Sequence, residues 1–150
     1  MLVKVINLDA PYSWVFGRYK FYDTRDRRMN HRGITAIYAT KKIDDSAYQK
    51  LADFDLPVPP KEELVLGAIV AIASLTDCIL MTDEFISEQS AAEIQCGIWR
   101  KGRYALKFED IQLLETPITV TGVKPGQWNL EDVLKVGGVV GKLTRIKLKL

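Results

Sequence analysis

The segment LGAIVAIASL, residues 66–75, is nearly continuous in apolar residues and rich in β-branched ones. Such a run is typical of a strand that is buried on both faces at the centre of a sheet. It is much shorter than the roughly 20 apolar residues that a membrane-spanning helix needs. The sequence therefore predicts a central strand here, with the other elements arranged around it.

Turn and cap residues on either side of this segment divide the chain into short elements. The patterns predict strands at 1–8, 21–25, 33–40, 104–108, 118–121 and 139–150. They predict helices from the Asp9 cap to residue 16, at 44–54 with Asp44 or Asp45 as the cap, at 87–96 with Ser87 or Ser90 as the cap, and at 130–136. Residues 57–60 are expected to form a loop, and residues 122–129 a turn that presents Trp128. Strands and helices do not alternate strictly, which disfavours a doubly wound parallel sheet and favours an α+β fold, a small mixed β-barrel with short peripheral helices.

The length and composition of the chain indicate a single globular domain over residues 1–150. The 150 residues are 47% hydrophobic and 27% charged, which supports both a buried core and solubility. The N-terminal residues lack the pattern of a signal peptide, and no apolar run is long enough to span a membrane. We therefore expect a cytoplasmic protein that does not associate with membranes.

Few residues of this chain are suited to metal binding or to nucleophilic catalysis. Cys78 and Cys96 are isolated, and His31 is the only histidine. We expect the cysteines to be small buried side chains in a reducing compartment. A zinc site, a histidine-based triad and a glycine-rich phosphate loop all lack the residues they require, so the sequence predicts no metal and no cofactor.

Positive charge is concentrated between residues 17 and 42. This segment holds eight Lys and Arg residues against two acids, although the net charge of the whole chain is only +2. A cluster of this kind attracts phosphates and other anions. It is the first place to look for a ligand.

Three side chains of this segment are candidates for one site. In an extended strand, residues at i and i+2 share a face, so Asp23 and Arg25 are expected to point the same way. Lys20 joins them only if the chain bends between Gly17 and Phe21, which a glycine permits. Arg25 can then hold a phosphate or carboxylate through two hydrogen bonds, while Lys20 acts as a point charge. An internal salt-bridge cluster without a ligand is the alternative interpretation.

Aromatic residues surround this candidate site. Stacking on aromatic rings beside a basic groove holds single-stranded nucleic acid, at about 1–3 kcal/mol per base. We expect Trp14 and Phe16 to pack into the core. Tyr12 and Tyr22 are the better candidates for exposed stacking residues.

The same residues resemble the hallmark of the ASCH domain, a branch of the PUA-like β-barrel superfamily. The hallmark reads G-x-K-x-x-E-x-R, and it is followed by Arg-Gly and by a strand that ends in a small polar residue and lysine. The matching positions here are Lys20, Asp23 and Arg25, then Arg32 with Gly33, then IYATK at 37–41. The resemblance continues through LGAIV at 66–70, the pair at 77–78, GRYAL at 102–106, and the segment from 117 to 130.

The resemblance covers about residues 3–130 and leaves 131–150 as a C-terminal extension. It implies a PUA-like barrel with a cleft that binds RNA or a nucleotide, lined by Lys20, Asp23 and Arg25 and flanked by Arg32 and Lys41. The chain departs from the hallmark at two points. Gly17 lies one residue further from Lys20 than the family spacing, and Asp23 replaces the usual glutamate.

Some ASCH-like proteins hydrolyse acetylated cytidine with a threonine nucleophile in place of the acid, and others are reported as ribonucleases. Here that position is Asp23, and Thr24 lies on the opposite face of the expected strand. If the protein is an enzyme, its catalytic residues would be Lys20, Asp23 and Lys41, with the aspartate as general base.

Three hypotheses follow. They are an RNA- or nucleotide-binding domain, a hydrolase acting on RNA or a modified nucleoside, and a protein-interaction domain whose basic strand at 142–149 forms an edge. The sequence does not indicate an oligomeric state.

Overall fold

A curled sheet forms the body of the protein in the computed structural model, which describes residues 2–119 and 126–129. Its centre is β4 (Ala68–Leu80), which pairs antiparallel with β3 (Gly33–Ile43) on one side and with β5 (Tyr104–Thr119) on the other. Most of the first eight residues of β4 are buried. The central strand predicted from the apolar run at 66–75 is therefore confirmed.

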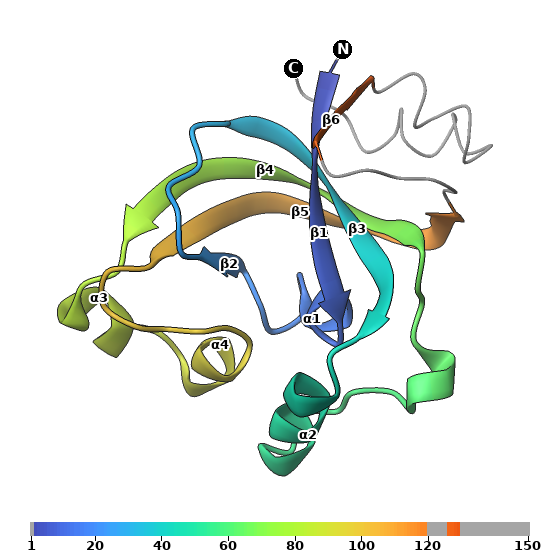
Figure 1. The fold of residues 1–150 in the computed structure, drawn as a ribbon, viewed down its shortest axis with the longest axis horizontal. Coiled ribbons are helices and arrows are strands. Elements are labelled where there is room, and N and C mark those ends of the chain that lie inside the picture. The colour runs from blue at the N-terminus through green and yellow to red at the C-terminus, as the bar shows by residue number, and fades with distance from the viewer. Residues whose placement is uncertain (1, 120–125, 130–150) are drawn as a thin grey trace.

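Three further strands complete the sheet. They are β1 (Leu2–Ala10), β2 (Tyr22–Arg25) and β6 (Gly126–Asn129), and the strand order is β2-β5-β4-β3-β1-β6. Only the β1–β3 pairing is parallel. Figure 1 shows the sheet curling into a half-barrel, so that β2 at one edge approaches the face of β1 near the other. The fold is α+β with a mixed, curled sheet, as the sequence predicted.

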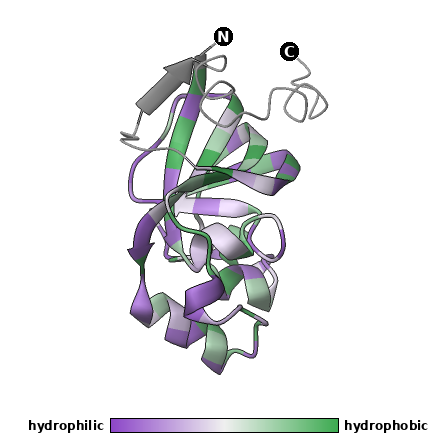
Figure 2. Cartoon of the chain, turned by 90° about the vertical axis from the view of Figure 1, so that its right-hand side faces the viewer, coloured by the Kyte–Doolittle hydropathy of each residue, from purple (hydrophilic) through white to green (hydrophobic). Residues whose placement is uncertain are grey.

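The concave side of the sheet holds the main hydrophobic core. Figure 2 shows hydrophobic residues concentrated along the strands, with hydrophilic residues more frequent on the helices and connections. Leu106 belongs to this core and lies directly opposite Asp23 in the β2–β5 ladder. Residues directly opposite each other in a ladder point to the same face of the sheet, so the Asp23 side chain points to the core side. The buried core residues are Ile6, Leu8, Phe16, Ile37, Ala71, Ala73, Leu75, Cys78, Leu106 and Phe108.

Short helices lie around the sheet. The helix α1 (Tyr12–Val15) follows β1 directly, and α2 (Asp45–Asp53) follows β3. A 3-10 turn, η1 (Lys61–Glu63), precedes β4, while α3 (Asp83–Ser87) and α4 (Ala91–Gln95) connect β4 to β5. The expected cap of α2 is present, because Asp44 Oδ1 accepts a hydrogen bond from the Ala47 backbone N–H at 3.0 Å.

The predicted start of the first helix at Asp9 was wrong. β1 extends to Ala10, and Pro11 occupies the N-cap position of α1. Asp9 instead accepts a hydrogen bond from the Thr40 hydroxyl at 2.6 Å. Pairing of Asp9 with a residue 31 positions away could not be recognised from a local capping pattern.

Three other boundaries differ from the sequence prediction. The helix predicted at 87–96 is the shorter α4, which Ser90 caps, and α3, which ends at Ser87, was not predicted. The strands predicted at 104–108 and 118–121 belong to the one long strand β5, as far as it is described. Three register shifts against β4 accompany the mostly exposed stretch between them, through which β5 continues. The turn predicted at 122–129 is wrong at its end, because Gly126–Asn129 pairs with β1 as β6. The helix predicted at 130–136 and the strand predicted at 139–150 lie outside the described residues.

Gly17 turns the chain between α1 and β2. Its φ is +78°, a backbone conformation that residues with a side chain rarely adopt. A Cβ atom there would lie 2.8 Å from Ile111 Cγ2 and 2.9 Å from Leu113 Cδ2, both on β5. The backbone conformation and the close approach to β5 both require glycine at this position.

We predict that Gly17→Ala lowers the free energy of unfolding by about 2 kcal/mol, the sum of backbone strain and overpacking of about 1 kcal/mol each. Gly102→Ala is the matched control, because Gly102 also has a positive φ (+93°) but nothing lies within 4 Å of its Cβ position. The free energy of unfolding of the Gly102→Ala variant should therefore fall by only about 1 kcal/mol. Urea unfolding of both variants measures the difference, and equal destabilisation would show that the close approach to β5 costs nothing.

Candidate functional site

The bend at Gly17 carries Lys20 into the protein. The Gly17 N–H donates to the Lys20 carbonyl at 2.8 Å, which closes a tight loop before β2 begins. Lys20 is 2% exposed and is among the largest fully buried side chains. The bend that the sequence predicted is present, and it brings Lys20 to the same side of β2 as Asp23.

Three groups surround the Lys20 ammonium. Its Nζ donates to the Cys96 carbonyl at 2.7 Å, and it lies 4.0 Å from Asp23 Oδ1. It also lies 5.4 Å from the centre of the Tyr12 ring. A buried ammonium is tolerated only when it is paired in this way. Lys20 is therefore held inside the protein. A ligand at the surface would interact with its charge electrostatically but would not contact its side chain.

Asp23 connects Lys20 to Arg25. The Asp23 side chain is 7% exposed, and its Oδ2 accepts from Arg25 Nε at 2.6 Å. Arg25 also donates from Nη2 to the Asn7 backbone carbonyl at 3.3 Å. Asn7 lies on β1, beyond the part of β1 that pairs with β6. Arg25 thus reaches across the open side of the half-barrel, from β2 to β1.

Arg25 is the one member of this group with a substantial exposed surface. Its side chain is 37% exposed, compared with 2% for Lys20 and 7% for Asp23. Within residues 2–119 and 126–129, nothing pairs with its third guanidinium nitrogen, Nη1. The arrangement fixes the direction of a guanidinium while leaving one of its edges open to a ligand.

Glu93 is a buried member of the site that sequence reasoning missed. It is 4% exposed, and its carboxylate accepts from the backbone N–H groups of Phe21 (3.0 and 3.1 Å) and Tyr22 (2.8 Å). From the sequence, Glu93 is recognisable only as a helix-capping partner of Ser90. Its own N–H does bond Ser90 Oγ at 3.1 Å, but the carboxylate holds the start of β2. Phe21 is 72 residues away in sequence, so only the fold brings the two residues together.

Burial shifts the titration of both buried groups toward their neutral forms. Burial lowers the pKa of Lys20 below its ordinary value, while the charges of Asp23 and Glu93 act to raise it. Burial raises the pKa of Glu93, opposed by the hydrogen bond from Phe21, the charge of Lys20 and the hydrogen bond from Tyr22. The two cations and two anions of the site balance one another, which is how a protein tolerates several buried charges.

The two tyrosines proposed as stacking residues are both half-buried and in contact with other groups. Tyr12 lies beneath Lys20, inside the fold. The Tyr22 ring packs edge-on against Phe85 at 5.8 Å and Trp99 at 5.6 Å. Tyr22 precedes Asp23 on the strand, so its side chain points to the opposite face. The structure therefore does not bring Tyr22 together with Lys20, Asp23 and Arg25.

Arg32 and Lys41 lie at opposite ends of β3. Arg32 is exposed and donates to the backbone carbonyls of Met29 and His31, both at 2.8 Å. Lys41 is exposed, and its side chain lies against Gly67. No contact among the described residues joins Lys41 to Lys20 or Asp23. The cluster implied by the family resemblance therefore consists of Lys20, Asp23 and Arg25, with Arg32 at the end of the adjoining connection.

The connection between β2 and β3, residues 26–32, is a basic surface beside Arg25. It carries three exposed arginines and one exposed acid, Asp26. Met29 packs against the hydrophobic core and so fixes the middle of the connection. Figure 1 shows the connection running along the side of the sheet from the end of β2 to the start of β3. We call this segment the arginine connection; its exposed cations are Arg27, Arg28 and Arg32.

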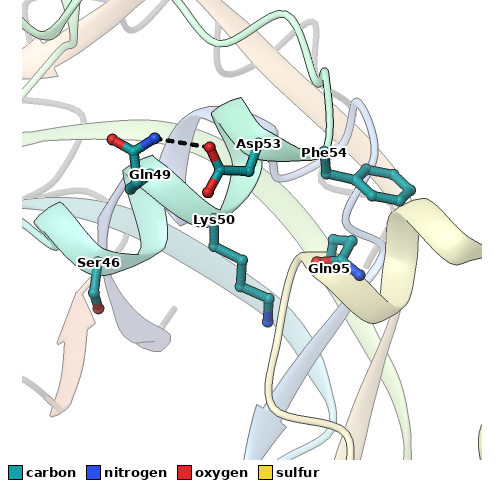
Figure 3. A pocket seen from close by; sticks show the side chains of 6 residues that line it. All are labelled: Ser46, Gln49, Lys50, Asp53, Phe54 and Gln95. Atoms are coloured by element: carbon teal, nitrogen blue, oxygen red, sulfur yellow. Dashed lines mark hydrogen bonds between the residues drawn. The ribbon is translucent and has the colours of Figure 1, made fainter.

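A separate open recess lies between α2 and α4, away from these residues. Figure 3 shows side chains from both helices around it, with Lys50 and Gln95 extending between them. Its volume is about 540 Å³. The Lys50 ammonium lies 3.4 Å from the Gly97 carbonyl. None of the residues predicted as site residues lines the recess, whose lining residues are Ser46, Gln49, Lys50, Asp53, Phe54 and Gln95.

Comparison with protein-family models and with curated proteins finds no match to this chain. Within the described residues, no helix is long and apolar enough to cross a membrane. No three His, Cys, Asp or Glu side chains of the described residues gather as a metal site would require. Cys78 and Cys96 are both buried and unbonded to each other, as the sequence predicted.

We predict that Lys20→Met lowers the free energy of unfolding by about 3–5 kcal/mol, because it removes a buried cation whose charge offsets those of Asp23 and Glu93 and leaves the buried Cys96 carbonyl without its donor. Lys42→Met is the control. Lys42 is also a lysine near an aspartate, 3.9 Å from Asp9 Oδ2, but its side chain is 75% exposed. The control should change stability by no more than about 0.5 kcal/mol. Chemical denaturation measures both, and an equally small effect of the two variants would mean that Lys20 is not needed to compensate the buried acids.

Proposed function

We propose that this protein is an ASCH-like domain of the PUA-like superfamily that binds RNA or a nucleotide through Arg25 and the arginine connection. The resemblance in sequence between residues 3 and 130 supports the family assignment. The curled mixed sheet with short helices is consistent with a PUA-like barrel. The geometry around Arg25 supports the ligand class.

The observation that carries this proposal is the half-exposed guanidinium of Arg25. One edge is held by Asp23 at 2.6 Å and by the Asn7 carbonyl at 3.3 Å. A cation that is already oriented loses less side-chain freedom when it binds an anion, so more of the interaction energy appears as affinity. A planar guanidinium suits the oxygens of a phosphate group.

The arginine connection supplies further positive charge next to this guanidinium. Arg27, Arg28 and Arg32 are exposed, and Asp26 is the one acid among residues 26–32. Contacts to successive phosphates dominate the affinity of most nucleic-acid-binding proteins and make it dependent on salt. A chain of phosphates is therefore the ligand whose charge pattern fits this surface.

Binding fits the geometry better than hydrolysis does. A general base or an oxyanion donor has to come within hydrogen-bond reach of the substrate. Lys20 and Asp23 are buried and already paired with protein groups, and Lys41 contacts neither of them. We therefore assign Lys20 and Asp23 to positioning Arg25 and propose no hydrolytic step.

We predict that Arg27→Ala combined with Arg28→Ala weakens the binding of a single-stranded RNA oligonucleotide. It should also reduce the slope of log affinity against log salt concentration by about 0.7 for each phosphate that the protein no longer neutralises. Lys42→Ala combined with Lys61→Ala removes the same charge from exposed lysines of the β3 end and η1. Fluorescence anisotropy at several salt concentrations measures both slopes. Equal effects of the two double variants would contradict a specific role for the arginine connection.

We also predict that Arg25→Lys binds the same oligonucleotide at least about tenfold more weakly than the native protein. Lysine keeps the charge, but it cannot bond Asp23, Asn7 and a phosphate in three fixed directions. The same anisotropy titration measures this effect. Affinity retained by Arg25→Lys would show that charge alone is required, and affinity retained by Arg25→Ala would place the binding site elsewhere.

A further inference from the structure

A row of three side chains crosses the end of the sheet beside the arginine connection, where β2 and β4 end and β5 begins (Figure 1). Arg25 lies directly opposite Tyr104 in the β2–β5 ladder, and Tyr104 lies directly opposite Leu80 in the β4–β5 ladder. Residues directly opposite each other point to the same face, so the three side chains share one face of the sheet. It is the concave face, because Leu106, two residues after Tyr104, belongs to the main core.

All three side chains of this row are accessible from outside. The side chain of Arg25 is 37% exposed, and Leu80 is 52% exposed although it is apolar. Tyr104 is half-buried and packs against the main core. Its hydroxyl has no hydrogen-bond partner among the described residues, and Asn7 Oδ1 is the one unpaired side-chain atom there that is buried. The Tyr104 hydroxyl therefore lies in contact with solvent, while the core holds the side chain in place.

The ring of Tyr104 is also free of other aromatic partners. No ring of the described residues packs against it, whereas Tyr22 packs against Phe85 and Trp99. Tyr22 and Tyr104 point to opposite faces of the sheet, because Tyr22 lies opposite Lys107 and not in the row of Arg25. Tyr104 is thus an aromatic residue on the Arg25 side whose ring is still available to a ligand.

The order of the three groups matches the order of groups in a nucleotide. Neighbouring strands lie about 4.8 Å apart, so Tyr104 is one strand away from Arg25 and Leu80 is two strands away. In a nucleotide, a single sugar separates the phosphate from the base. A phosphate bound at the free edge of Arg25 can therefore place its base over Tyr104 and Leu80. An aromatic ring beside a basic surface is what proteins use to hold the flat face of a base.

We propose that Tyr104 and Leu80 form a stacking surface for an unpaired base of RNA, next to the phosphate that Arg25 binds. The ligand is then single-stranded RNA, because a base inside a duplex is already stacked on its neighbours and cannot lie on the sheet. This inference rests on the proposed RNA-binding function and adds base contacts to its phosphate contacts. Phosphates alone would leave the apolar end of the row, at Leu80, uncovered.

The test uses the full chain and two fluorescently labelled chains of equal length and charge, an oligoadenylate and an abasic ribose-phosphate polymer. The native protein should bind the oligoadenylate at least about fivefold more tightly, which is the contribution of one weakly stacked base. Tyr104→Leu keeps an apolar side chain against the core and should reduce the affinity for oligoadenylate to that for the abasic chain. Tyr104→Phe keeps the ring and should preserve the preference. Fluorescence anisotropy measures all the affinities.

Two further variants separate the loss of stacking from a loss of folding. Leu80→Ser changes an exposed side chain and should weaken the binding of oligoadenylate but not that of the abasic chain. Tyr48→Leu is the matched control, because Tyr48 is also half-buried but lies on α2, where its hydroxyl donates to the Pro59 carbonyl. It should leave both affinities unchanged.

The outcomes distinguish this inference from the function on which it rests. Equal binding of the two chains by the native protein would overturn the stacking surface and leave the proposed phosphate contacts in place. A preference for oligoadenylate that persists in folded Tyr104→Leu and Leu80→Ser variants would also overturn it, because the base would then be stacked elsewhere. Binding of neither chain would contradict the proposed function itself, and this inference with it.

Discussion

The buried carboxylate of Asp23 is the group on which the open side of this fold depends. It faces Lys20 on one side at 4.0 Å and Arg25 on the other at 2.6 Å. Through Arg25 it connects β2, at one edge of the sheet, to the Asn7 carbonyl on β1. β2 is only four residues long and pairs with β5 alone, so backbone ladder bonds hold it from one side. The side-chain link from Asp23 holds it from the other and sets the width of the half-barrel opening.

The buried charges around this link come in balanced numbers. Lys20 and Arg25 are the cations, and Asp23 and Glu93 are the anions. The carboxylate of Glu93, on α4, accepts hydrogen bonds from two backbone N–H groups at the start of β2. The carbonyl of Cys96, the residue that follows α4, accepts a hydrogen bond from the Lys20 ammonium. α4 and β2 are therefore fixed to each other by polar contacts rather than by a large apolar interface. Such contacts are directional, so they specify one arrangement, although apolar packing in their place would often be as stabilising. We infer that they serve to orient the exposed edge of Arg25.

Sequence patterns predicted those parts of the structure whose formation depends on residues that are close together in sequence. The apolar run at 66–75 indicated the central strand, and the Asp44 cap indicated the start of α2, because both depend on neighbours in sequence. The i, i+2 rule paired Asp23 with Arg25, and Gly17 indicated the bend that brings in Lys20.

Contacts between distant segments account for what the sequence could not show. Glu93 was missed as a site residue because its partners are 71 and 72 residues away. The continuity of β5 was missed for the same reason, since its mostly exposed middle pairs with β4 through register shifts that no local pattern shows. Tyr22 was predicted to be an exposed stacking residue, but Phe85 and Trp99 come from segments whose approach to β2 is set by the fold.

The central claim is that Arg25 is held from within by Asp23 and meets the ligand with its free edge. The arginine Nε–H signals in a ¹H–¹⁵N NMR spectrum test it most directly, recorded before and after addition of a single-stranded RNA oligonucleotide. We expect the Arg25 Nε–H to be protected from solvent exchange in the free protein, unlike those of Arg27 and Arg28. We also expect the Arg25 signal to move when RNA is added while its protection persists. A freely exchanging Arg25 Nε–H, or a signal that stays in place at saturating RNA, would contradict the claim.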